Sequence, residues 1–220
     1  IARCFRDEDQ RGDRQPEFTQ LDMEMSFIDM EDIMAINEKL MIALTKEFAP
    51  EKKIKQIPFP VLTYEEAMNL YGSDKPDLRF DLPLSDITDI AEECGFGVFS
   101  GAIKNGGVVK ALCVSGGAKF TRKEIDDLTE VAKIYRAKGL AYIVVENEGP
   151  KSPILKFLKE EEIKAILERC EAKVGDIIFF TADTFHTACE ALGYVRLSVA
   201  DKLNLKDKNL FAYLWVKDFP

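Results

Sequence analysis

A short stretch near the start of the chain concentrates side chains that can bind anionic and polar ligands. It reads CFRDEDQRGDRQPEF over residues 4–18 and mixes arginines with aspartates and glutamates. Arginine binds phosphate and carboxylate through a rigid two-pronged fork. A carboxylate such as Glu8 can accept a hydrogen bond from the exocyclic amine of a base, and Asp22 can hold a ligand ammonium. The residue types alone leave two interpretations open: a solvated surface loop, or a binding site for an anionic, polar ligand.

The elements that must position these side chains are predicted to form a hairpin. Residues 1–7 fit a short strand, residues 8–17 a polar loop, and residues 18–27 a return strand, because FTQLDMEMSF alternates between apolar and polar positions. The apolar face of that strand holds Leu21, Met23, Met25 and Phe27. Alternation usually means that one face packs on a core and the other meets water. Here the polar face would equally suit the floor of a polar ligand cleft.

Composition indicates a globular protein. The chain has 220 residues, of which 46% are hydrophobic and 31% charged, enough for one large or two small domains with a buried core. A formal net charge of −9 argues against sequence-blind nucleic-acid binding, although it allows a local basic site.

Cysteine usage and hydropathy favour a cytoplasmic location. The five cysteines are scattered and form no C-x-x-C pair, which disfavours a zinc site or a disulfide framework. No apolar run approaches the roughly 18–20 residues that span a bilayer, and no signal peptide is visible. Since Ile1 is not an initiator methionine and LFAYLWVKDFP at residues 210–220 reads as a strand, we expect a piece of a longer protein.

The first part of the chain continues with two helices around a short strand. Apolar residues at helical spacing predict a helix from Asp29 to about Phe48 with a core-facing stripe, and a strand is expected near residues 59–62. The stripe consists of Ile33, Ile36, Leu40, Met41, Leu44 and Phe48. TYEEAMNLYG predicts a helix that begins after Thr63 and ends at Gly72. The following SDKPDLRFDLPLSD is the best domain boundary in the chain.

Strands and helices alternate in the second part, which predicts a mixed α/β or α+β domain. Helices are expected from Ser85 to Gly95, from Thr121 to about Gly139, within residues 153–172, and over residues 183–192 before Gly193. Strands are expected at residues 97–103, 108–114, 140–146 and 176–183, the first two joined through KNGG as a hairpin.

The second part offers weak candidates for chemistry. SGGAKF at residues 115–120 could cradle a phosphate, but a plain strand-to-helix connection is favoured because the glycine spacing matches no phosphate-binding motif. His186, the single histidine, lies in a helical pattern without a nucleophile beside it, so a catalytic role is disfavoured. Cys189 follows His186 by three residues and so lies near the same face of the predicted helix, yet two residues do not make a metal site.

The first part carries a dense resemblance to a known family. RCFRDEDQRGDRQPEFTQLDMEMSF resembles motif 2 of class II aminoacyl-tRNA synthetases, specifically the bacterial-type aspartyl-tRNA synthetases. YGSDKPDLRF at residues 71–80 and the closing LFAYLWVKDFP are similar to two further stretches of the same enzymes. The part between them is similar to the GAD domain that the bacterial form inserts between motifs 2 and 3.

The resemblance implies a fold class and a domain division. The class is α/β (α+β): a piece of a class II antiparallel-sheet catalytic domain with an inserted mixed α/β GAD domain. The division is a partial catalytic domain at 1–76, the GAD domain at 77–208 and a return strand at 209–220. The insertion is expected to fold independently.

The resemblance also assigns roles to residues of the hairpin. Arg6 resembles the catalytic arginine that bridges the ATP α-phosphate and the aspartate carboxylate. Glu8 resembles the acid that reads the adenine amino group, Asp7 lies in the same nucleotide segment, and Gln15 matches another ATP contact.

Three further residues correspond to contacts with aspartate and with tRNA. Asp22 resembles the residue that holds the α-ammonium of aspartate. Arg11 and Arg14 resemble the loop residues that meet the acceptor end of tRNA.

The implied activity is ATP-dependent formation of aspartyl-adenylate and transfer of aspartate to tRNA(Asp) by a homodimer without a membrane association. Motif 1 would lie before Ile1, and motif 3 with the Mg²⁺ ligands after Pro220, so the chain alone is expected to be inactive and to hold no metal. Two alternatives stay open. One is a non-catalytic tRNA-binding or structural paralogue. The other is a GAD-bearing subunit of a tRNA-dependent amidotransferase, which CFRDED and FTQLD disfavour. Whether tRNA(Asn) is charged as well depends on regions outside the chain.

Overall fold

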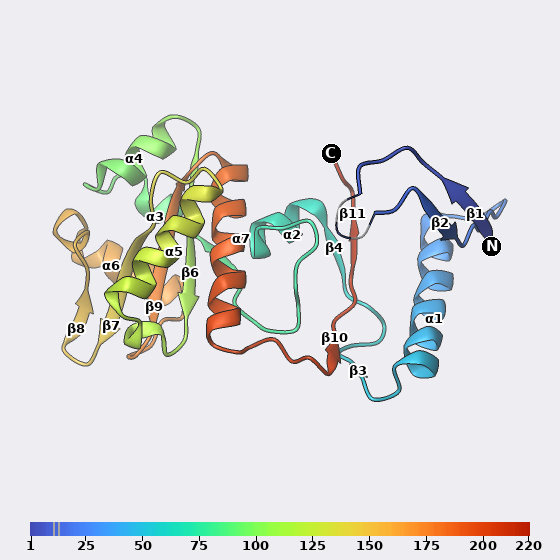
Figure 1. Cartoon of the computed structure of the whole chain (residues 1–220). Coiled ribbons are helices and arrows are strands. Elements are labelled where there is room, and N and C mark those ends of the chain that lie inside the picture. Colours follow the sequence, from blue (N-terminus) through green and yellow to red (C-terminus); the bar gives the residue numbers. More distant parts are fainter. Residues whose placement is uncertain (11, 13) are drawn as a thin grey trace. The chain divides into compact units, whose positions relative to one another are not determined.

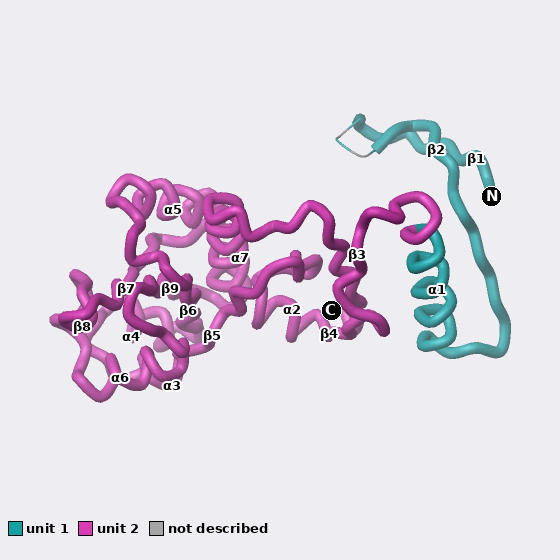
Figure 2. The backbone as a smooth tube through the Cα atoms, turned by 90° about the horizontal axis from the view of Figure 1, so that it is seen from below, with its two compact units in different colours: residues 1–44 teal, residues 45–220 magenta. Residues whose placement is uncertain are grey.

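The structure is a computed structural model that describes residues 1–10, residue 12 and residues 14–220 (Figure 1). It divides into two compact units, residues 1–44 and residues 45–220 (Figure 2). Each unit is described by itself. Within the part of the chain that the structure describes, no helix combines the length and the apolar composition needed to cross a membrane.

The first unit opens with the predicted hairpin. Strand β1 (Ala2–Phe5) pairs antiparallel with β2 (Glu17–Gln20), and the register runs from Ala2 opposite Gln20 to Phe5 opposite Glu17. The return strand predicted over residues 18–27 is wrong beyond Gln20. The pairing of β1 with β2 ends at Gln20 opposite Ala2, and residues 21–27 form no strand.

Helix α1 (Met30–Phe48) confirms the predicted helix but not its buried stripe. Thr45 is the single buried residue on α1, whereas Met41, Leu44 and Phe48 are exposed, Phe48 to 79%. Leu21, Met23, Met25 and Phe27 before the helix are exposed as well. Many of the apolar side chains in residues 21–48 are therefore not covered by other parts of this chain.

The second unit begins with short elements that the chain's last residues join. Strands β3 (Lys53–Ile54) and β4 (Val61–Thr63) pair in parallel with β10 (Leu210–Phe211) and β11 (Trp215–Lys217). Helix α2 (Tyr64–Tyr71) follows β4 and confirms the predicted caps. Thr63 and Glu66 form a capping box that lowers the pKa of Glu66, chiefly through the Thr63 backbone N–H, and Gly72 ends the helix at φ 67°.

A five-stranded antiparallel sheet is the centre of the second unit, in the order β5-β6-β9-β7-β8. The strands are β5 (Leu84–Asp86), β6 (Val108–Val114), β7 (Ala141–Glu146), β8 (Gly149–Lys151) and β9 (Ile177–Asp183). The predicted strands at 108–114, 140–146 and 176–183 are confirmed. The short strands β5 and β8 were not predicted.

Helices cover both faces of this sheet (Figure 1). The helices are α3 (Thr88–Ala91), α4 (Gly97–Lys104), α5 (Arg122–Ile134), α6 (Glu160–Arg169) and α7 (Phe185–Lys202). Helices α5 and α7 pack on the face that carries Leu112 and Phe179; α3, α4 and α6 pack on the face that carries Ile143 and Ile178. Two buried layers therefore flank one sheet, and the α/β class is confirmed.

Two element predictions in this unit are wrong. Ser85 lies in β5 opposite Ala111 and caps no helix. Residues 97–103 belong to helix α4, because β6 already has β5 on one side and β9 on the other and offers no free edge. KNGG therefore joins a helix to a strand.

Two predicted helix ends also differ. Helix α5 ends at Ile134, before Gly139. Helix α7 continues through Gly193 to Lys202, since this glycine meets another part of the chain rather than ending the helix.

Candidate ligand site on the N-terminal hairpin

The backbone hydrogen bonding of the hairpin continues one residue pair beyond β1 and so closes the base of the polar loop. The backbone N–H of Arg6 donates to the carbonyl of Pro16 at 2.8 Å. Because Arg6 therefore lies opposite Pro16, its side chain and that of Phe18 point to the same side of the hairpin. The register places Arg3 and Glu17 on the opposite face, where Arg3 Nε lies 2.8 Å from a carboxylate oxygen of Glu17.

A pocket of about 550 Å³ opens on this hairpin. Its lining consists of Arg6, Glu8, Arg14, Gln15, Glu17 and Phe18. Four of these are residues to which the sequence resemblance gave a ligand contact: Arg6, Glu8, Arg14 and Gln15. The pocket thus brings together two guanidinium groups, an amide and carboxylates from both sides of the loop.

The Arg6 guanidinium lies over the ring of Phe18, 5.3 Å from the ring centroid. Such a contact holds a cation by the negative face of the ring and leaves the N–H groups at the edge of the guanidinium available to other acceptors. This arrangement suits an arginine that must present its fork to an anionic ligand.

Glu8 and Arg14 face each other across the loop at 3.5 Å between a carboxylate oxygen and Nη1. Both side chains remain in contact with water, so the pair contributes little stability, of the order of 0–1 kcal/mol. A ligand that offers a phosphate to Arg14, or an amine to Glu8, can therefore replace this pair at small cost.

The remaining predicted site residues do not line the pocket. Asp7 is exposed beside it, and Asp22 is exposed two residues past the end of β2. Arg11 lies outside the described residues.

Phe18 and Glu17 line the pocket without having been singled out from the sequence. The signal that could have found Phe18 is the hairpin register, which places it diagonally across from Arg6 on one face. Among the described residues, no three histidine, cysteine, aspartate or glutamate side chains gather closely enough to hold a metal ion.

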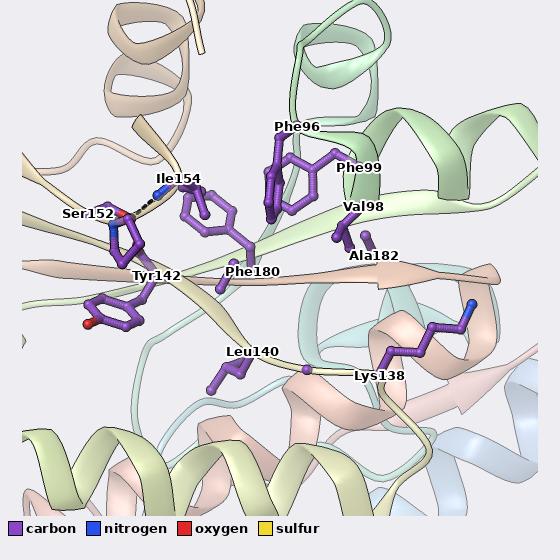
Figure 3. A pocket seen from close by; sticks show the side chains of 13 residues that line it. Phe96, Val98, Phe99, Lys138, Leu140, Tyr142, Ser152, Ile154, Phe180 and Ala182 are labelled. Atoms are coloured by element: carbon purple, nitrogen blue, oxygen red, sulfur yellow. Dashed lines mark hydrogen bonds between the residues drawn. The ribbon is translucent and has the colours of Figure 1, made fainter. Parts of the chain in front are cut away.

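A second cavity lies in the second unit, where α4 covers the ends of β7 and β9 (Figure 3). It measures about 340 Å³, and its walls include Phe96, Phe99 and Phe180. The Ser152 hydroxyl at its edge donates to the carbonyl of Tyr142, so this polar group is already satisfied. The sequence did not reveal this cavity, because its phenylalanines have the pattern of ordinary core residues.

The weaker candidates of the second unit take structural roles. The Asp176 carboxylate accepts a hydrogen bond from Gly116 N at 2.9 Å, so the chain's own anion lies at the SGGAKF turn. This turn connects β6 to α5, which confirms the favoured interpretation. Burial raises the pKa of the Cys189 thiol to about 11, which keeps the thiol protonated and a poor nucleophile.

Comparison with known proteins gives the chain relatives over its whole length. Residues 99–192 match the family model of the GAD domain. The chain is 53% identical over 220 residues to the aspartate–tRNA(Asp/Asn) ligase of Desulfosudis oleivorans and 51% identical over 221 residues to that of Bacillus subtilis. The resemblance to aspartate–tRNA ligases is confirmed.

A third relative, the aspartate–tRNA ligase of Clostridium perfringens, is 48% identical over 220 residues. In all three alignments the whole chain is covered, but it corresponds to only 36–37% of the relative. The chain thus spans a little more than a third of the length of the curated relatives it matches.

Proposed function

We propose that this chain forms part of the catalytic domain, together with the GAD domain, of an aspartate–tRNA ligase. The activity is ATP-dependent formation of aspartyl-adenylate followed by transfer of aspartate to tRNA(Asp). One observation carries the proposal: Arg6, Glu8, Arg14 and Gln15 line a single polar pocket in a chain about half identical throughout to enzymes of that name.

Arg6 is the catalytic residue of the proposal. In adenylate formation a carboxylate oxygen of aspartate attacks the α-phosphorus of ATP, and the bond from this phosphorus to the departing pyrophosphate breaks. A guanidinium fork that contacts both the α-phosphate and the carboxylate holds the two reactants together and stabilises the charge on the phosphate oxygens. Stacking of Arg6 on Phe18 supports this role, since the ring limits the directions in which the guanidinium can point. Glu8, Gln15 and Asp7 bind the nucleotide, Glu8 by accepting from the adenine amino group.

The contacts to the other two substrates involve residues around the pocket. Asp22 holds the α-ammonium of aspartate, and Arg11 and Arg14 meet the acceptor end of tRNA. For Asp22 and Arg14, solvent exposure supports the proposal, because both side chains are open to a ligand that arrives from outside. Mg²⁺ accompanies ATP and is held by residues outside this chain.

The domain division stays part of the proposal: catalytic residues 1–76 and 209–220 enclosing a GAD domain at 77–208. Two observations support it. The GAD match at residues 99–192 falls inside the proposed insertion. Strands β10 and β11, from the last residues, pair with β3 and β4 before it, as expected of an insertion between neighbouring segments. A homodimer in the cytoplasm is the expected setting of the whole enzyme.

Aspartate-dependent exchange of pyrophosphate into ATP tests the proposal. A polypeptide that extends this chain to the length of its relatives should catalyse exchange with aspartate and not with glutamate. The 220-residue chain alone should show none, because it supplies only part of the site. Exchange by the short chain at a rate near that of the long one would contradict the proposal. Charging tRNA(Asp) and tRNA(Asn) in parallel would decide between the two names that the relatives carry.

A further inference from the structure

Helices α2 and α7 meet at two glycines whose backbones touch. A Cβ atom built on Gly193 would lie 2.6 Å from the carbonyl oxygen of Gly72 and 2.9 Å from that of Tyr71. Real Cβ atoms do not approach oxygen so closely, and the obstacles are backbone atoms that no rotamer change can move aside. Helix α7, whose first residues belong to the GAD match at 99–192, is therefore fitted to the end of α2, an element that lies wholly outside the match.

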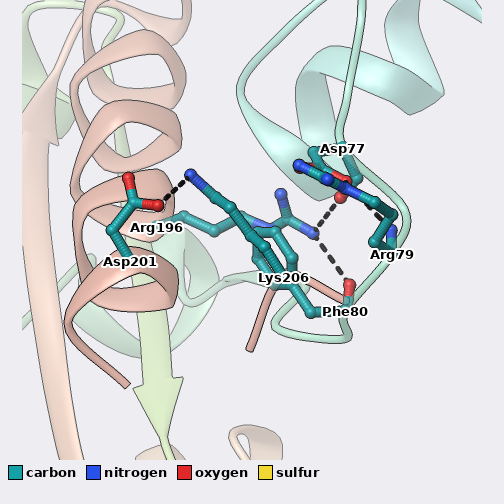
Figure 4. A network of polar contacts seen from close by, with 6 residues as sticks. All are labelled: Asp77, Arg79, Phe80, Arg196, Asp201 and Lys206. Carbon is teal, nitrogen blue, oxygen red and sulfur yellow. Dashed lines mark hydrogen bonds and ion pairs between the residues drawn. The ribbon is translucent and has the colours of Figure 1, made fainter. Parts of the chain in front are cut away.

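Arg196, one turn along α7, fixes the connection between α2 and the sheet (Figure 4). Its side chain is 1% exposed and donates to the carbonyls of Leu82 at 2.8 Å, Asp77 at 2.9 Å and Phe80 at 3.2 Å. The guanidinium lies over the rings of Tyr71 and Phe80, 4.9 and 4.1 Å from their centroids. Burial lowers the pKa of Arg196 to about 10, so it stays charged at neutral pH.

A second buried cation, Lys110 of strand β6, connects helix α2 to the sheet. Its ammonium lies 2.8 Å from the Asp86 carboxylate and donates to the side-chain amide of Asn69 on α2. The Lys110 side chain is fully buried. Separation of α2 from the sheet would remove the hydrogen bond from Lys110 to Asn69 and the contact of Arg196 with the Tyr71 ring, while Asp86 and the three carbonyls would remain. The loss of a hydrogen bond and of a ring contact by two buried cations is destabilising.

We propose that Gly193, Arg196 and Lys110, which lie within the proposed GAD domain at 77–208, form an obligatory interaction surface whose partner is the α2 segment of the same chain. The GAD domain then unfolds together with α2 and with the strands β4 and β11 beside it, as one cooperative unit. A GAD domain cut out at residue 77 would lack Asn69, Tyr71 and Gly72. This inference is independent of the proposed function, because it concerns stability and not ligands.

The chain carries its own reporter for the test. Trp215, the single tryptophan, lies in β11 opposite Val61 of β4, outside the GAD match. Urea unfolding of the 220-residue chain should be followed by Trp215 fluorescence and by far-ultraviolet circular dichroism. Ile178→Val removes one methyl group from the fully buried GAD core. The Trp215 midpoint should fall by the same amount as the dichroism midpoint; an unchanged Trp215 midpoint would overturn the proposal.

A pair of glycine variants tests the surface itself. Gly193→Ala places a methyl group against the Gly72 backbone, whereas Gly101→Ala makes the same change in helix α4 where nothing lies within 4 Å. Gly193→Ala should lower the Trp215 midpoint, and Gly101→Ala should leave it unchanged or raise it. If the two variants behave alike, the contact between α2 and α7 does not couple the two parts and the proposal fails.

Discussion

The two units of this chain differ in what they bury. Among the described residues of 1–44 none is buried, although this unit holds the polar pocket and the residues that this chain contributes to the proposed site. Residues 45–220 contain a sheet that is covered on both faces, and the cavity under α4 has mainly apolar walls. The comparison teaches that the proposed chemistry of this chain lies where its own packing contributes least, while most of the buried packing lies in the second unit.

The largest expected difference in unfolding free energy is between the loss of one aromatic ring in the second unit and the loss of one in the first. Phe179→Ala removes a fully buried ring from β9 and should lower the free energy of unfolding by about 3–5 kcal/mol. Phe5→Ala removes a ring that is 68% exposed and should change it by less than about 0.5 kcal/mol. Urea denaturation followed by circular dichroism measures both. Equal effects would remove the distinction between the units.

Two ion pairs provide the next comparison. Lys110→Met in the second unit leaves Asp86 and Asn69 without their buried donor, and should cost about 1–3 kcal/mol of unfolding free energy. Arg14→Met in the first unit breaks the exposed pair with Glu8 and should cost less than about 0.5 kcal/mol. The same denaturation assay applies, and a costly Arg14 variant would show that the hairpin is stabilised by its own charges.

Acid should weaken the second unit through the cap of α5. Hydrogen bonds from the Thr121 backbone, the Lys202 side chain and the Thr121 hydroxyl lower the pKa of Glu124 from 4.5 to about 2. A carboxyl whose pKa is lower in the folded state contributes stability above pH 4.5, and this contribution is lost as the pH falls toward 2. Glu124→Gln should flatten the dependence of the urea midpoint on pH between these values. A profile as steep as that of the parent would contradict the assignment.

The smallest effect concerns the exposed apolar surface of the first unit. Phe27 is fully exposed and has φ 59°, a conformation that asparagine tolerates better than phenylalanine. Phe27→Asn should change the free energy of unfolding by less than about 0.5 kcal/mol. It should reduce the fluorescence of a dye that binds exposed apolar surface, and unchanged dye binding would show that this ring is not part of such a surface.

The sequence predicted elements wherever a local signal and the tertiary contacts agree. Thr63 with Glu66 and Thr121 with Glu124 mark true helix starts, because a capping box satisfies the first free N–H groups without help from elsewhere. Residues 97–103 were mistaken for a strand because a short apolar run carries no decisive period, and only the occupied edges of β6 decide it.

Prediction of the site had a different limit. The residue types of the hairpin suggested an anion and a polar ligand, but the individual roles of Arg6, Glu8 and Gln15 came from resemblance and not from spacing. The strand beyond Gln20 was overestimated because an alternating pattern indicates a preference for strand pairing but does not show where the pairing ends. The pocket itself follows from the loop between β1 and β2, whose conformation no pattern encodes.

One measurement tests the central claim most directly: aspartate-dependent pyrophosphate exchange by two arginine variants of the polypeptide that extends this chain to the length of its relatives. Arg6 lines the pocket, whereas Arg3, three residues earlier, belongs to the opposite face of the hairpin, pairs with Glu17 and does not line the pocket. We predict that Arg6→Ala reduces the exchange rate by about 100-fold or more, while Arg3→Ala changes it less than about twofold. Equal rates in the two variants would contradict the assignment of the hairpin pocket to the ATP and aspartate site.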